Sequence, residues 1–73
     1  MVKVLDTSKT IKNEKTRKAV VSLFADAKSD VESATETDII EFPKDYRIDW
    51  GSSAMTADGE VGFLKSDGTW NWL

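Results

Sequence analysis

The chain has 73 residues with no cysteine and no histidine, so we expect one small domain without disulfides, zinc sites or catalytic pairs built on those side chains. Charges of both signs are mixed and sum to −3, which argues against nucleic acid as the main partner. No apolar run approaches the roughly 20 residues that span a bilayer, and the first residues lack the apolar region of a signal peptide. We therefore expect the chain in the cytoplasm, or in a larger assembly formed there.

The N-terminus predicts a short strand, because Val2, Val4 and Leu5 are apolar around a single lysine. Residues 6–9 are typical of a turn. From about residue 10 to residue 31, apolar side chains recur every three or four positions, which predicts one amphipathic helix. The face of this helix would contain Val20, Leu23, Phe24, Ala27 and Val31.

The predicted helix has two acceptable N-caps, Thr10 and Asn13, so its start is open by about one turn. After it, residues 32–44 are polar and acidic and predict a solvated loop. Ile39, Ile40 and Phe42 form a short apolar knot within this loop. The knot is either an edge strand or a pin that holds the loop to the core.

The C-terminal part, residues 46–73, predicts a three-stranded antiparallel meander. Apolar and polar residues alternate over 52–57, 60–65 and 69–73, and the Gly-containing turns at Asp58-Gly59 and Ser66-Asp67-Gly68 separate these strands. The predicted fold is therefore α+β, with a short N-terminal strand and one helix packed across the meander in a single domain.

The 13 acidic residues form no recognisable catalytic pair. A domain of this size has little room for a cleft in which two carboxylates converge on a substrate. Asp58 and Asp67 lack the alternating spacing of a calcium loop, and their turns explain them. We therefore expect no enzyme, no cofactor and no metal site.

Three tryptophans fall in the last third of the chain. A small core uses such large side chains, which is the interpretation we favour for Trp70. Exposed tryptophan on a sheet also binds carbohydrate or protein. Trp50 and Trp72 fit either interpretation equally well, so both are candidate partner-binding residues.

A run of cations crowds the start of the predicted helix, where it opposes the helix macrodipole, and only Glu14 balances it. This run contains Lys9, Lys12, Lys15, Arg17 and Lys18. It is either a solvated face or a surface that meets an acidic partner, which would be another protein or a second copy of this chain. The run lacks the interleaved aromatic residues of a nucleic-acid reader. Our candidate partner-binding cations are Lys12, Lys15, Arg17 and Lys18.

Two runs near the C-terminus carry a resemblance to a known group of proteins. They are Gly51-Ser52-Ser53-Ala54-Met55 and Asp58-Gly59-Glu60-Val61-Gly62-Phe63-Leu64-Lys65-Ser66-Asp67-Gly68-Thr69-Trp70. They resemble the C-terminal hairpin module of small proteins encoded among the structural genes of tailed bacteriophages and prophages. Gly62 departs from that pattern, which is expected to have an aromatic residue there. The resemblance implies a role in the virion and transfers no catalytic residue.

Three functions remain open from the sequence. The first is a phage or prophage structural or assembly protein that docks onto other virion proteins. The second is a carbohydrate- or cell-wall-binding module, because the Phe63 to Trp70 run also resembles one unit of the cell-wall-binding repeats of Gram-positive surface proteins. The third is a small intracellular regulator that binds a host protein or DNA through the basic run.

Overall fold

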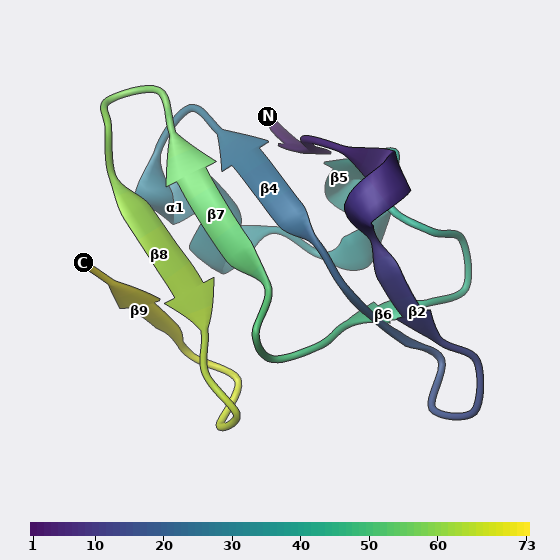
Figure 1. The fold of residues 1–73 in the computed structure, drawn as a ribbon. Helices are drawn as coiled ribbons and strands as arrows, with labels where there is room; N and C mark the ends of the chain where they lie inside the picture. The colour runs from purple at the N-terminus through teal and green to yellow at the C-terminus, as the bar shows by residue number, and fades with distance from the viewer.

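The computed structural model describes residues 1–73 and contains nine strands, one α-helix and two 3-10 helices (Figure 1). The strands are β1 (Val2–Val4), β2 (Ile11–Asn13), β3 (Lys18–Val20), β4 (Ser22–Ala25), β5 (Ile39–Ile40), β6 (Arg47–Ile48), β7 (Ser53–Thr56), β8 (Val61–Leu64) and β9 (Trp70–Trp72). The helices are η1 (Thr7–Lys9), α1 (Lys28–Ser33) and η2 (Glu36–Asp38). No helix is long and apolar enough to cross a membrane.

The strands form two sheets. The larger has six strands in the order β5-β1-β4-β7-β8-β9, and the smaller has the order β2-β3-β6. The predicted α+β class and the N-terminal strand are confirmed. The predicted three-stranded meander is present, but the prediction that it forms the complete sheet is wrong. β7, β8 and β9 do pair antiparallel in sequence, but β7 also pairs in parallel with β4, which makes the meander half of a larger sheet.

The long helix predicted over residues 10–31 is wrong, because most of this stretch forms β2, β3 and β4. Only Lys28–Ser33 is α-helical. The run from Lys18 to Ala25 contains a second periodicity of two, and its members Ala19, Val21, Leu23 and Ala25 are all buried. Short apolar runs fit both periods, and here the pairing of β4 with β1 and β7 decides for the strand.

A tight turn joins β2 to β3 where the helix start was expected. The Asn13 side chain accepts hydrogen bonds from the backbone N–H groups of Lys15 and Thr16, at 3.1 and 3.3 Å. Arg17 closes the turn with a φ of 56°. Asn13 therefore caps a turn instead of a helix, which is the other structure that its short polar side chain favours.

The core lies on one face of the six-stranded sheet, which we call the inner face, where α1 contributes Val31. Side chains of successive residues along a strand alternate between the two faces, and paired residues of neighbouring strands share one face, so the buried residues line up on the inner face. The buried apolar residues are Val2, Val4, Ala19, Val21, Leu23, Ala25, Val31, Ile39, Ala54 and Leu64. In Figure 1, α1 lies behind the sheet, so the viewer looks onto the opposite, outer face.

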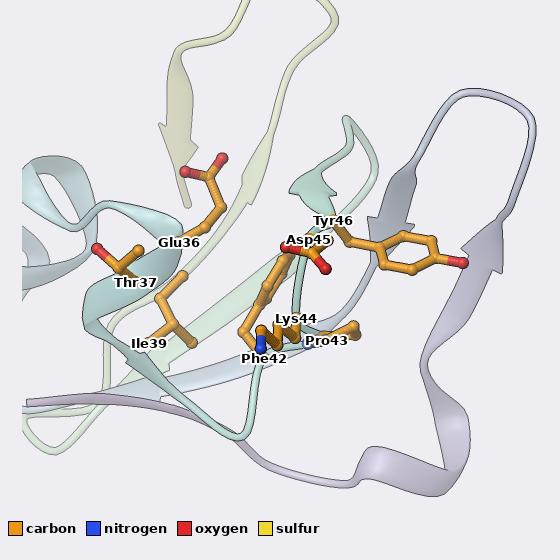
Figure 2. A pocket seen from close by; sticks show the side chains of 8 residues that line it. All are labelled: Glu36, Thr37, Ile39, Phe42, Pro43, Lys44, Asp45 and Tyr46. Atoms are coloured by element: carbon orange, nitrogen blue, oxygen red, sulfur yellow. The ribbon is translucent and has the colours of Figure 1, made fainter.

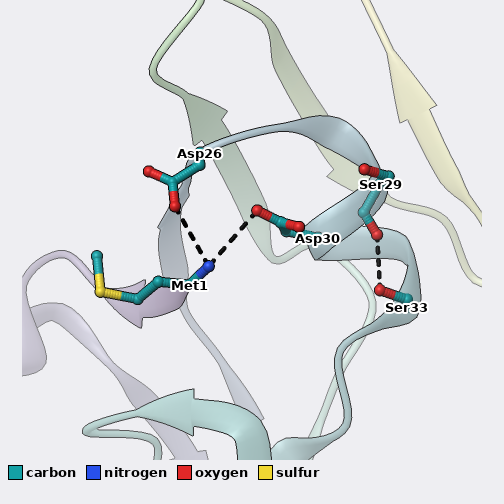
Figure 3. Close-up of polar contacts among 5 residues, drawn as sticks. All are labelled: Met1, Asp26, Ser29, Asp30 and Ser33. Atoms are coloured by element: carbon teal, nitrogen blue, oxygen red, sulfur yellow. Dashed lines mark hydrogen bonds and ion pairs between the residues drawn. The ribbon is translucent and has the colours of Figure 1, made fainter.

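The stretch predicted as an acidic solvated loop contains the end of α1, then η2 and β5. Ile39 is buried and pairs in parallel with Val2, so the edge-strand alternative for the apolar knot is the correct one. Near the start of α1, the N-terminal ammonium of Met1 lies 3.3 Å from Asp26 and 3.5 Å from Asp30 (Figure 3). These two carboxylates hold β1 beside the helix.

Three turn carboxylates accept hydrogen bonds that favour their charged form. The hydroxyl of Ser8 lowers the pKa of Asp6, that of Thr56 lowers the pKa of Asp58, and that of Thr69 lowers the pKa of Asp67. A carboxyl whose pKa is lower in the folded than in the unfolded chain stabilises the fold above the unfolded value. That stability is lost as the pH falls through the folded pKa.

We therefore expect the free energy of unfolding to be level near neutral pH and to decline below the ordinary aspartate pKa of 3.8. Urea unfolding followed by tryptophan fluorescence across this pH range measures the decline. The double variant Asp6→Asn, Asp67→Asn should show a shallower decline, because two of the three titrating groups are gone. Equal slopes in the two proteins would contradict the assignment.

Candidate functional site

The four candidate cations gather in one hairpin. Lys12 lies in β2, Lys15 and Arg17 lie in the turn, and Lys18 begins β3. A fifth cation, Arg47, comes from β6, which pairs in parallel with β3. We call these five residues the basic tip. All five are exposed.

Tyr46 lies among these cations. The Lys12 ammonium is 5.8 Å from the centre of the Tyr46 ring, and the Arg17 guanidinium is 5.5 Å from it. Both distances are within the range of cation–π attraction. The basic run itself contains no interleaved aromatic residue, as expected from the sequence, and Tyr46 reaches it from a distant part of the chain.

The basic tip contains an unfavourable pair of like charges. Lys18 lies directly opposite Arg47 in the β3–β6 register. Like charges in facing positions destabilise a sheet. The structure contains four ion pairs, and none of them includes a residue of the basic tip. The charge of the tip is therefore left for an external anionic group.

Sequence reasoning missed Arg47 and Tyr46 because they are 29 positions from the strand that they join, as the Lys18–Arg47 register shows. Parallel pairing between distant short strands leaves no local signal. The predicted meander over residues 46–73 also gave this segment no partner outside the meander, whereas β6 pairs with β3.

The tryptophans occupy different environments. Trp70 and Trp72 are half-buried on the inner face, where their rings stack with centroids 6.0 Å apart and pack against the core. Lys28 covers Trp72 at 5.8 Å. Trp50 is 62% exposed, in the connection between β6 and β7. The core interpretation therefore fits Trp70 and Trp72, and Trp50 is the one tryptophan available as a platform for carbohydrate.

A surface pocket of about 450 Å³ lies next to the basic tip (Figure 2). It is lined by Glu36, Thr37, Ile39, Phe42, Pro43, Lys44, Asp45 and Tyr46. Figure 2 shows Tyr46 pointing from the pocket toward the β2–β3 hairpin, so this side chain belongs to both features. Ile39, Phe42 and Pro43 supply the apolar part of the lining.

The loop that lines part of the pocket has two strained backbone positions. Asp45 in the lining and Glu41, which precedes Phe42 in the same loop, have φ values of 68° and 65°, in the left-handed region that costs a non-glycine residue roughly 1–2 kcal/mol. Such strain is often found where a surface binds a ligand. The side chain of Glu36 is held in place, since it accepts a hydrogen bond from the backbone N–H of Ile48 at 3.4 Å. No group of three carboxylates gathers anywhere in the structure as a metal site would require.

Comparison of the chain with protein-family models, curated protein sequences and solved structures finds no significant match.

Proposed function

We propose that this chain is a non-enzymatic structural or assembly protein of a tailed bacteriophage or prophage, and that its basic tip docks onto an acidic surface of another virion protein. Its place of action would be the virion, or the bacterial cytoplasm during assembly. The observation that carries the docking proposal is the gathering of five cations in the β2–β3 hairpin and β6, none of them in an ion pair, with Lys12 and Arg17 beside the Tyr46 ring. The phage assignment is supported by the resemblance of residues 51–70.

The geometry favours an acidic protein segment over a nucleic acid. The net charge of the chain is −3, which repels a polyanion at long range, whereas a short acidic segment meets only the tip. The pocket beside Tyr46 offers Phe42 and Pro43 to an apolar side chain of the same segment. Charge would then steer the partner and the pocket would fix its position.

Affinity capture from phage-producing cells, followed by mass spectrometry, tests this function. The bait is the whole protein, compared with the variant Lys12→Gln, Lys15→Gln, Arg17→Gln. The matched control is Lys3→Gln, Lys28→Gln, Lys65→Gln, which removes the same number of charges at sites outside the tip. We expect the wild-type protein and the control to retain a virion protein, and the tip variant to lose it.

Salt gives a second measurement on the same baits. Capture through the tip should weaken as sodium chloride rises from about 50 to about 300 mM, because the Debye length falls below the spacing of exposed charges. Repeated absence of the chain from purified particles would contradict the virion role. Retention on single-stranded DNA that the tip variant alone loses, with no protein captured, would assign the tip to nucleic acid instead.

A further inference from the structure

The outer face of the six-stranded sheet is apolar and uncovered. The β-ladders align Phe24, Met55 and Val61 in one row across β4, β7 and β8. Of the nine large hydrophobic side chains that stay exposed, seven lie on this face or on its continuation over β2, and the other two are Met1 and Trp50. The seven are Leu5, Ile11, Ile40, Met55, Val61, Phe63 and Leu73, each between 40 and 80% exposed.

The apolar patch on this face lies in the upper part of the range for monomeric proteins, and the strands that form it carry little charge. Seven half-exposed side chains amount to an apolar patch on the order of 500 Å², near the upper limit for monomeric proteins. Lys3 is the only charged residue within the strands of the six-stranded sheet. α1 packs on the inner face, so this helix does not cover the outer one (Figure 1). A sheet face of this kind is normally buried against a second layer.

From these observations we propose that the second layer is another copy of the same chain, packed face to face about a two-fold axis. The two largest dimensions of the domain are 35 and 23 Å. These dimensions limit the outer face to about 800 Å², which is what each partner contributes to a standard interface. A nearly uncharged patch also meets its own copy without the repulsion that a charged patch would suffer.

Charge at the two ends of the face selects the orientation. Side chains on the outer side of β3 and β4 run from Lys18 through Val20, Ser22 and Phe24, and Asp26 follows at the far end. A two-fold axis that lies in the interface and runs perpendicular to the strands reverses the strand direction of the second copy. Lys18 and Arg47 of each copy then lie over the Asp26 end of the other. The alternative orientation would bring four cations together. Asp26 and Asp30 share one ammonium group, that of Met1, so this end keeps a negative charge.

Sedimentation analysis of the purified whole protein over a wide concentration range tests the interface. We expect the wild-type protein to form dimers, and Met55→Lys and Phe63→Lys each to raise the dimer dissociation constant at least about tenfold. Both side chains are exposed in strands, so the variants should fold, which circular dichroism checks. Trp50→Lys is the matched control, because Trp50 is also an exposed large apolar side chain but lies outside the face, and it should dimerise like the wild type.

A charge swap tests the orientation. Lys18→Glu and Asp26→Lys should each weaken the dimer at low salt, and the double variant should recover it. Eight residues of extended chain separate the two positions by about 26 Å, so they have no direct contact within one copy. Recovery therefore reports a contact between copies.

Three results would overturn the proposal. They are a wild-type protein that stays monomeric at all concentrations, a dimer that survives both lysine variants, and a double swap that restores nothing. A monomer would leave the face to another protein. The dimer engages Lys18 and Arg47 of the basic tip, whereas the docking test replaces Lys12, Lys15 and Arg17. The two proposals therefore fail in separate experiments.

Discussion

Replacing Gly62 with alanine is expected to lower the free energy of unfolding by about 3 kcal/mol, the upper end of the cost of overpacking. Gly62 faces Trp72 across the β8–β9 ladder. A Cβ atom at Gly62 would lie 2.6 Å from Cε3 of Trp72 and 2.8 Å from the carbonyl oxygen of Asn71. Neither atom moves easily, because one belongs to a ring stacked on Trp70 and the other to the backbone. A domain of 73 residues has only a few kcal/mol of stability in total, so much of the variant should be unfolded.

Urea unfolding followed by tryptophan fluorescence measures this loss. Gly59→Ala is the comparison, because Gly59 has a φ of 89° and nothing within 4 Å of its added Cβ, so it costs only about 1 kcal/mol of backbone strain. The double variant Gly62→Ala, Trp72→Leu should lose less than the sum of its single variants, because the smaller side chain relieves the clash. A Gly62→Ala loss no larger than that of Gly59→Ala would show that Trp72 does not pack on Gly62.

Ser52→Ala should cost about 1–3 kcal/mol, because it leaves the buried backbone N–H of Val21 without a partner. Ser52 has no exposed surface. Its Oγ accepts the backbone N–H of Val21 at 3.1 Å and donates to the carbonyl of Asp49 at 2.8 Å. The Ser52 side chain thus replaces a backbone hydrogen bond between strands at the junction of the two sheets.

The junction needs this bond because the two paired segments differ in length. Lys18 pairs with Arg47, but Ser22 pairs with Ser53, so the β6–β7 segment has two extra residues. These residues form the outward turn that exposes Trp50, and Ser52 re-enters the sheet behind it. The Ser52 hydroxyl accepts the backbone N–H of Val21, for which the interrupted segment offers no backbone carbonyl.

Ser53→Ala is the matched control, since the Ser53 hydroxyl is near the surface and contacts only the hydroxyl of Ser22, at 3.3 Å. It should change the free energy of unfolding by less than about 0.5 kcal/mol. Unfolding midpoints in urea compare the two variants under identical conditions. Equal midpoints for Ser52→Ala and Ser53→Ala would mean that the junction does not depend on the buried hydroxyl.

Part of the candidate site could be predicted from the sequence. The basic run at residues 12–18 stood out by composition alone, and the four cations chosen from it do lie together. The helix expected to hold them was wrong. A hairpin brings residues that are close in sequence together just as a helix does, so the cluster itself could not distinguish the two. Tyr46 and Arg47 could not be added, since they reach the tip through a parallel pairing with β3.

The C-terminal turns and the alternation around them were determined by local chemistry. Asp58-Gly59 and Asp67-Gly68 fix two turns, because glycine adopts the positive φ that they require and the aspartates bond to neighbouring threonines. These preferences act within a few residues, so β7, β8 and β9 follow from the sequence alone. The same holds for β1, whose apolar residues alternate around Lys3.

The tertiary structure alone decided what the run from Lys18 to Ala25 becomes and which faces are covered. Its apolar residues satisfy a helical and an extended period equally, and burial of one extended face between β1 and β7 selects the strand. That choice shortens the helix to six residues, which cover the inner face only. The exposed outer face is thus a consequence of long-range pairing, which depends on residues too distant in sequence to leave a local pattern.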